Sequence, residues 1–212
     1  MAVLDDTVLT LAAAFEALAA EAWPACLLDE RLRIAGVNGA WNAFALANGG
    51  EGCLGPALHG TAYLRHVEGV EPRTRVSLEL ARAMEGDRVS SDSECNTPDR
   101  VRLLRTNYVP VRATGAGAVC GVLVVHTTVV EFAAGATQPH GEPSEAAHRG
   151  GTGQVIMCSC CRRVRRALPP RTWEYVPAYL AEPPSQVSHG FCPTCAVQYG
   201  LTALEMKLVL AS

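Results

Sequence analysis

The chain begins with a segment whose apolar positions recur at alternating steps of four and three residues. They form one stripe: Leu4, Val8, Leu11, Phe15, Leu18 and Ala22. This spacing predicts an amphipathic helix within residues 1–23. Asp5, Asp6 or Thr7 could cap its first turn, and Pro24 would end it. Two arrangements stay open: the helix packs on a sheet of its own domain, or it pairs with a second copy.

Farther along, short apolar runs alternate with polar turns and with two segments of helical period. The expected strands are 26–29, 32–37, 88–96, 101–111 and 119–130, and the expected helices are 39–48 and 76–84. Residues 119–130 are almost continuously apolar and β-branched, which is typical of a central strand covered on both faces. The order predicts an α+β domain with a five-stranded antiparallel sheet and flanking helices.

The cysteines divide the chain further, because five of the nine lie near the C-terminal end. Between them and the sheet, residues 133–153 are rich in Gly, Ala and Pro and show no apolar periodicity, which predicts a flexible linker. We therefore expect an N-terminal helix (1–23), a sheet-bearing domain (24–132), the linker (133–153) and a cysteine-rich module (154–212).

Short motifs mark the sheet-bearing domain. They are N-x-x-W-x-x-F at 38–44 with N-G-G at 48–50, G-x-x-Y-L at 60–64, E-C-N-T-P at 94–98 and G-V-L-V-V-H at 121–126. Together with the order β-β-α-α-β-β-β, they resemble a PAS-domain subgroup of bacterial sensor proteins over about residues 22–131. Asn96 stands where that subgroup has His. The resemblance implies a PAS-like sheet with flanking helices and a sensory role.

The resemblance also implies a pocket between sheet and helices that could hold a small ligand of unknown identity. The candidate lining residues are His126, Cys95, Cys120, His59 and His66. A haem would need one of the histidines as its axial ligand. A lone histidine beside a sheet is more often simply hydrogen-bonded.

The clearest chemistry lies in two C-x-x-C pairs, Cys158 with Cys161 and Cys192 with Cys195. Two such turns can direct four thiolates to one ion, the closed tetrahedral arrangement of a structural zinc site. Cys160 is a spare thiol that could replace a ligand of the first pair. An iron–sulfur cluster on the same four cysteines is the alternative cofactor.

The residues around the two pairs support a small metal module. Arginines follow the first pair at 162–166, and S-H-G-F-C-P-T-C runs over 188–195. The stretch resembles a C-terminal module of some bacterial signalling proteins. His189 is an alternative ligand or a hydrogen-bonding neighbour of one. Trp173, Val176 and Tyr179 have the spacing of a short helix that could form a mini-core.

Composition narrows the function classes. The 212 residues carry a net charge of −3, which argues against nucleic-acid binding through the overall field. The basic run still leaves open a transcriptional regulator that binds nucleic acid through the module. No apolar run approaches the roughly 18 residues that a membrane span needs. The acidic N-terminal residues do not resemble a secretory signal, so we expect a reducing, cytoplasmic location.

No nucleophile–base motif is present, so we expect no enzyme activity. We expect a non-enzymatic sensor or adaptor that forms a homodimer and signals through a protein partner. A redox or iron–sulfur sensor is the alternative from a different class.

Overall fold

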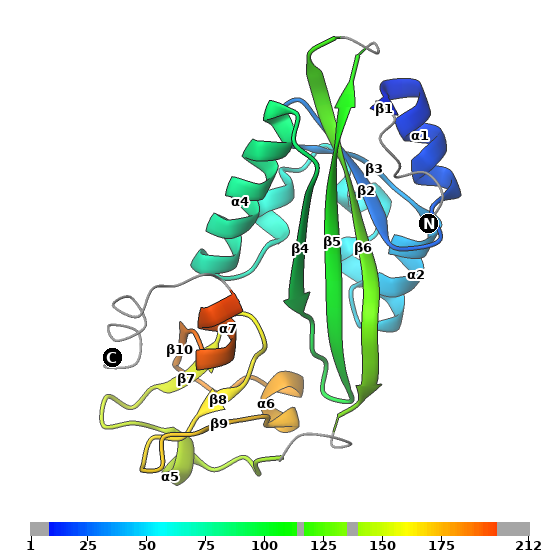
Figure 1. Ribbon diagram of the computed structural model, residues 1–212. Helices are drawn as coiled ribbons and strands as arrows, with labels where there is room; N and C mark the ends of the chain where they lie inside the picture. The colour runs from blue at the N-terminus through cyan, green and yellow to red at the C-terminus, as the bar shows by residue number, and fades with distance from the viewer. Residues whose placement is uncertain (1–8, 114–116, 135–139, 199–212) are drawn as a thin grey trace. The chain divides into compact units, whose positions relative to one another are not determined.

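The computed structural model describes residues 9–113, 117–134 and 140–198, which form two compact units (Figure 1). Unit 1 comprises Met1–Asp92 and Leu104–Val129, and unit 2 comprises Ser93–Leu103 and Val130–Ser212. Residues 93–103, which the sequence pattern assigned to the sheet-bearing domain, therefore belong to unit 2. The helix positions predicted before residue 9 lie outside the described residues.

Unit 1 contains most of a six-stranded sheet, three of whose strands continue into unit 2. Its strands are β1 (Leu9–Thr10), β2 (Ala25–Asp29), β3 (Ile34–Val37), β4 (Val89–Glu94), β5 (Arg100–Arg112) and β6 (Val119–Ala133). The order is β1-β5-β6-β2-β3, and β4 also pairs with β5. β2 is antiparallel to β3 and to β6. All five predicted strands are present, and the sequence pattern missed β1, a short strand parallel to β5.

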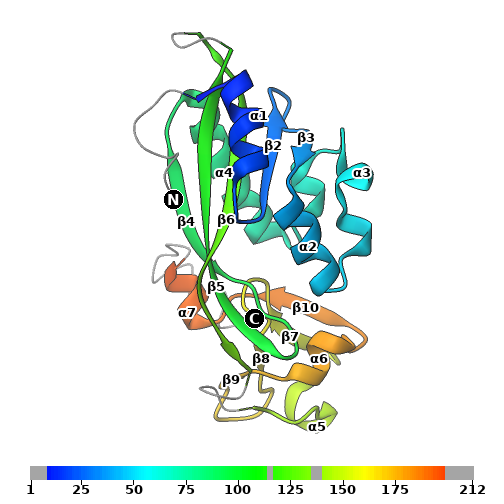
Figure 2. The same ribbon diagram turned by 90° about the vertical axis from the view of Figure 1, so that its right-hand side faces the viewer.

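The central strand β6 is covered on both faces, as its continuous apolar run predicts. Val122 and Val124 belong to one core cluster, and Leu123 and Val125 belong to the other. Because successive strand side chains point to opposite faces, the two clusters lie on the two sides of the sheet. Figure 2 shows the helices on either side of these strands. The fold is thus α+β with the PAS-like element order that the resemblance predicts.

The helices of unit 1 are α1 (Leu11–Ala20), α2 (Gly39–Ala47), α3 (Gly55–Leu58) and α4 (Val70–Glu85), with short 3₁₀ turns at Glu51–Cys53 and Tyr63–His66. Asn38 caps α2, because its Oδ1 accepts from the amides of Trp41 (2.9 Å) and Ala25 (3.1 Å). Gly86 ends α4 in the left-handed conformation, with φ +108°. Among the described residues, no helix is long and apolar enough to cross a membrane.

Helix α1 begins later than the stripe suggested. Thr10 is its N-cap, and its side chain accepts from the Ala13 amide at 3.3 Å. Ala14 and Leu18 are buried in the core cluster that also contains Leu123 and Val125 of β6. Of the two arrangements left open, the described part of the helix shows packing on the sheet of its own unit.

The described part of unit 2 contains a four-stranded sheet and three short helices. The strands are β7 (Val155–Cys158), β8 (Val164–Arg165), β9 (Trp173–Glu174) and β10 (Val187–Gly190), in the order β10-β7-β8-β9. The helices are α5 (Glu145–His148), α6 (Pro177–Ala181) and α7 (Pro193–Gln198). The predicted mini-core forms from Val176 and Tyr179 with Val155, Met157 and Val164. Trp173, expected on a helix, lies in β9 instead.

The segment predicted to be a flexible linker contains ordered structure in its described part. Residue His140 bridges to Tyr175, and α5 follows. His148, the last residue of α5, is 2% exposed, and its Nε2 lies 3.3 Å from Oε2 of Glu174. No sequence pattern indicated this burial, because the partner of Nε2 is a carboxylate 26 residues away rather than part of a local apolar pattern.

Candidate metal centre

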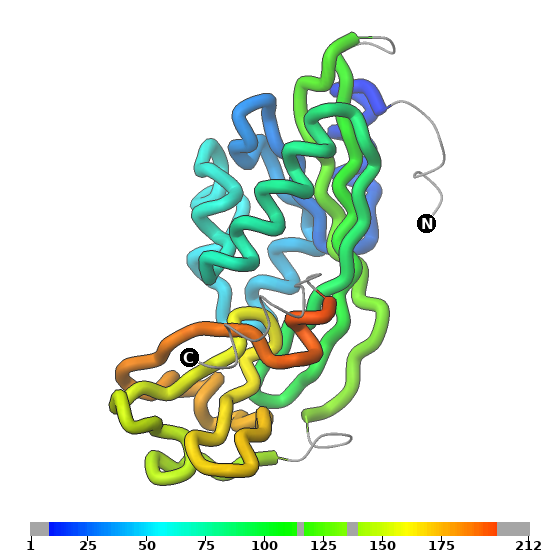
Figure 3. The backbone as a smooth tube through the Cα atoms, turned by 60° about the vertical axis from the view of Figure 1, so that its left-hand side comes forward, coloured from blue at the N-terminus to red at the C-terminus, as the bar shows by residue number. Residues whose placement is uncertain are grey.

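The two C-x-x-C pairs are brought together by the pairing of β7 with β10. The two strands are parallel, with Val187 opposite Val155 and Gly190 opposite Cys158. In the tube of Figure 3, β7 and β10 can be followed by their yellow-green and orange colours. Cys158 therefore ends β7 beside Gly190, which ends β10, and Cys192 lies two residues after Gly190. The parallel register places both turns at the same edge of the sheet.

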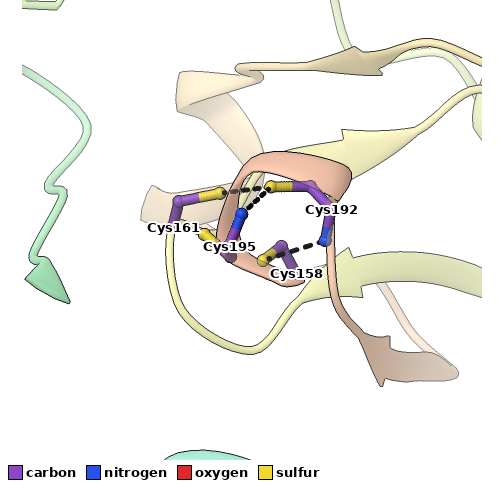
Figure 4. A group of neighbouring side chains, drawn as sticks. All are labelled: Cys158, Cys161, Cys192 and Cys195. Carbon is purple, nitrogen blue, oxygen red and sulfur yellow. Dashed lines mark hydrogen bonds between the residues drawn. The ribbon is translucent and has the colours of Figure 1, made fainter. Parts of the chain in front are cut away.

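The four sulfur atoms form a compact group (Figure 4). All four cysteines are buried, and their Sγ atoms lie within 4.8 Å of one another. Sγ of Cys161 lies 3.6 Å from Sγ of Cys192. Four thiolates around one zinc, each about 2.3 Å from it, stand about 3.8 Å apart. The donor set and its spacing therefore fit a single tetrahedral cation.

Local backbone geometry holds each pair. In the first turn the Arg162 amide donates to the carbonyl oxygen of Cys158 at 3.1 Å, and Arg162 adopts φ +63°. In the second turn Pro193 begins α7, which carries Cys195 back toward Cys192. The amide of Cys195 donates to Sγ of Cys192, and the amide of Cys192 donates to Sγ of Cys158, both at 3.4 Å. Such N–H donors stabilise thiolates.

Four thiols this close influence one another's ionisation. Hydrogen bonds from Cys160 and the other three thiols lower the pKa of Cys158. Contacts with Cys158 and its neighbours raise the pKa of Cys195. The group therefore loses its protons as one coupled set, with each new thiolate opposing the next. A divalent cation removes this opposition, because it favours all four thiolates together.

One arginine of the predicted basic run lies at the cysteines. Burial lowers the pKa of Arg163, but Cys161, Glu94 and Cys192 outweigh that effect and raise it above its ordinary value. Its guanidinium thus partly balances the negative charge that four thiolates bring to one ion. Arg166 instead pairs with Glu174, with Nη1 2.9 Å from Oε1. Two arginines of the basic run thus face different carboxylates, Arg163 facing Glu94 and Arg166 facing Glu174.

The two alternative ligands of the predicted site lie outside the four-sulfur group. Cys160 is half-buried and packs against the cluster that contains the four cysteines. His189 is exposed on β10, where it pairs with Met157. The group of candidate ligands that the structure brings together is Cys158, Cys161, Cys192 and Cys195.

The candidate residues of a PAS pocket are divided between the two units. Cys95 belongs to unit 2, and Cys120 packs against the sheet face opposite to the one that Val124 covers. His59 is exposed, and Nε2 of His66 lies 2.8 Å from Oγ1 of Thr61. Of the five residues, only His126 sits in a polar group within the core of unit 1.

His126 has a polar partner at each ring nitrogen. Nδ1 lies 3.0 Å from Oγ1 of Thr106, and Nε2 lies 3.4 Å from the hydroxyl of Tyr63. The Trp41 ring packs on the imidazole, with centroids 5.8 Å apart. Burial lowers the pKa of His126 to about 4. The histidine is therefore neutral at physiological pH and anchors β6 to the helical layer.

Sequence reasoning missed a second polar group in the same core. Glu79 on α4 is 9% exposed, and its Oε1 lies 2.8 Å from Nε of Arg75. Burial raises the pKa of Tyr108, and the nearby Tyr63 and then Glu79 raise it further. The spacing of Arg75 and Glu79, four residues apart on a helix, is the signal that could have indicated the pair. Nothing local would have indicated Tyr108.

No family model matches this sequence, and no curated protein matches it. Among solved structures, the PAS domain of Bordetella pertussis BvgS has a TM-score of 0.41 and 17% identity, covering 51% of this chain and 77% of that one. A PAS domain of a Colwellia psychrerythraea protein has a TM-score of 0.41 and 12% identity, covering 54% and 92%. A PAS domain of an HTR-like protein from Haloarcula marismortui has a TM-score of 0.37 and 12% identity, covering 56% and 91%.

These structural neighbours are PAS domains of low identity. The assignment of fold rests on the protein's own element order and on the two core clusters of its sheet.

Proposed function

We propose that this chain is a non-enzymatic sensor or adaptor in which a PAS-like unit is joined to a structural zinc module. The observation that carries the proposal is the group of four buried cysteines whose Sγ atoms lie within 4.8 Å of one another. A site closed by four thiolates offers no open position for a substrate, so the ion would serve the fold. The PAS-like fold of unit 1 supports a sensory role for the other part.

The spacing of the sulfurs favours one ion over an iron–sulfur cluster. A two-iron or four-iron cluster places several metal atoms and sulfides between its cysteines, which spreads the thiolates apart. All four Sγ atoms lie within 4.8 Å of one another, closer than thiolates bound to different irons of such a cluster. Zinc is the cation whose preferred ligands and coordination number match this set.

The experiment is elemental analysis of freshly purified protein, combined with its visible absorption spectrum. We expect a colourless protein with about one zinc per chain. Cys195→Ser should lose the metal, whereas Cys160→Ser, the matched control from the same cluster, should keep it. A brown protein that contains iron and labile sulfide would contradict the zinc site and favour the iron–sulfur sensor. A protein that binds no metal would remove the module from the proposal.

We extend the proposal to assembly and location. The protein would form a homodimer, act in the cytoplasm and pass its signal to a protein partner. Leu11 and Phe15 support the dimer, because they are 44% and 49% exposed on α1 although Ala14 and Leu18 are buried. Light scattering after size exclusion should give twice the chain mass, and Phe15→Glu should shift it to the monomer. A wild-type monomer would contradict the dimer.

A further inference from the structure

A hairpin that the sequence assigned to the PAS-like domain belongs to the unit that holds the four cysteines. Unit 2 includes Ser93–Leu103, the end of β4, the turn and the start of β5. The hairpin is closed by its own backbone: the Cys95 amide donates to the carbonyl oxygen of Arg102 at 2.9 Å, and the Thr97 amide to that of Arg100 at 2.8 Å. Side-chain contacts join this hairpin to other segments of unit 2.

The side-chain amide of Asn96 joins the hairpin to a candidate metal ligand. Its Nδ2 donates to the backbone carbonyl of Cys161 at 2.9 Å and to Oε2 of Glu94 at 3.0 Å. Its Oδ1 accepts from the Arg102 amide at 3.2 Å. One side chain thus uses its acceptor and both donor directions, and it connects both strands of the hairpin to the first cysteine turn.

A charged pair beside Asn96 makes a second connection. Oε2 of Glu94 lies 3.4 Å from Nη2 of Arg163, and the two side chains are only 15% and 16% exposed. Arg163 also belongs to the first cysteine turn, because the Cys158 amide donates to its carbonyl oxygen at 2.8 Å. The ion pair therefore joins the hairpin to the segment that carries Cys158 and Cys161. A pair this sheltered is screened less by salt than a surface ion pair.

A third connection reaches the turn of the hairpin. The hydroxyl of Tyr175 donates to the carbonyl oxygen of Thr97. Tyr175 is 1% exposed and follows directly after β9. The hairpin is therefore held at its strands by Asn96 and Glu94 and at its turn by Tyr175, all within unit 2.

We propose that metal occupancy of the four-cysteine site controls the order of the Ser93–Leu103 hairpin, with Asn96 as the positioning residue that links them. The inference rests on the proposed metal site and assigns it a regulatory consequence. A bound ion fixes the turn of Cys161, and that turn presents the carbonyl to which Asn96 is bonded. Since the hairpin is the covalent continuation of β4 and β5, the state of the metal site is passed to two strands of the PAS-like sheet.

The test is hydrogen exchange of the full chain, with zinc and after chelation, read at the amides of Cys95, Thr97 and Arg102. We expect chelation to speed exchange at these three amides by about tenfold or more. The Leu27 and Leu123 amides, in the pairing of β2 with β6, serve as the internal reference and should stay protected. Hairpin protection that is unchanged after complete zinc removal would overturn the inference and leave the metal site standing.

Variants separate the link from the metal site. Asn96→Ala should keep about one zinc per chain and yet show fast hairpin exchange both with and without zinc. Asn48→Ala, the control, removes an amide that donates to Phe44 in unit 1 and should behave like wild type. Glu94→Gln keeps Asn96 and weakens the Arg163 pair, so it should show an intermediate effect even if Asn96→Ala fails to fold. Wild-type hairpin protection in both Asn96→Ala and Glu94→Gln would overturn the role of this link.

A protein that binds no zinc in the elemental analysis would overturn both the metal site and this inference. The two failures are therefore distinguishable, because the first is seen in metal content and the second only in hairpin exchange at full occupancy.

Discussion

The two units bury different chemistry in their cores. In unit 1, β6 sends Val122 and Val124 to one core cluster and Leu123 and Val125 to the other, so apolar burial on two faces holds the sheet. In unit 2, four of the six buried residues in one cluster are cysteines with their sulfurs together. Unit 2 has a further apolar cluster, around Val164 and Tyr179, so a bound metal would add its folding free energy to a small core. The comparison predicts that the two units respond differently to the same perturbation.

Metal removal should give the largest difference. A chelator should unfold unit 2 and leave unit 1 folded, because structural zinc supplies an apparent binding free energy of about 10–16 kcal/mol to modules of this kind. The measurement is hydrogen exchange at β7, which belongs to unit 2, and at β2, which belongs to unit 1. Added zinc in excess over the chelator should restore protection of β7. Protection of β7 that survives chelation would make unit 2 a conventional apolar core.

The sequence predicted unit 1 better than unit 2, for a physical reason. The nearly continuous apolar run of 119–130 is a local pattern, and the structure buries it on both faces of the sheet. The C-x-x-C spacing likewise predicted which four cysteines come together, because each pair lies within one turn. Local patterns, whether apolar or ligating, are what a sequence displays directly.

The parts that could not be predicted depend on distant partners. Asn96 is bonded to Cys161, which is 65 residues later, and His148 is paired with Glu174, which is 26 residues later. Neither residue belongs to a periodic pattern, so nothing in the sequence indicated that Ser93–Leu103 belongs to unit 2 or that Glu145–His148 forms a helix. The parallel pairing of β10 with β7 likewise could not be predicted from any local sequence pattern. Polar contacts of this kind follow only from tertiary structure.

A core truncation should affect unit 1 alone. Leu80 on α4 is 0% exposed, so Leu80→Ala should lower the free energy of unfolding of unit 1 by about 2–5 kcal/mol. Leu78, on the same helix, is 63% exposed, and Leu78→Ala should cost less than about 0.5 kcal/mol. Denaturant unfolding followed with unit-specific exchange would measure both, and zinc content should remain constant. Equal effects of the two variants would contradict the placement of α4.

Acid should reveal a contribution of His126 to unit 1. Burial lowers its pKa from 6.5 to about 4, so the unfolded chain binds the proton first as pH falls. The stabilisation is therefore complete above pH 6.5 and is lost progressively between 6.5 and about 4. We expect a loss on the order of 2 kcal/mol in unit 1 across this interval.

The measurement is denaturant unfolding of unit 1 at a series of pH values, compared with the same series for His126→Gln. That variant should flatten the dependence, whereas His59→Gln, which changes an exposed histidine, should keep the wild-type slope. A slope that survives His126→Gln would assign the acid sensitivity to other groups.

Removing the N-cap of α1 should give the smallest loss of stability, and this loss should be confined to one helix of unit 1. Thr10 accepts from the Ala13 amide, so Thr10→Ala removes an N-cap and should cost about 1 kcal/mol. Thr10→Ser keeps a hydroxyl at this position and should cost much less. Because Ala14 and Leu18 hold α1 on the sheet independently of its cap, the loss should appear as faster exchange of the first helical turn. Detachment of the whole helix in Thr10→Ala would instead mean that its two buried side chains contribute less than their 0% and 6% exposure indicates.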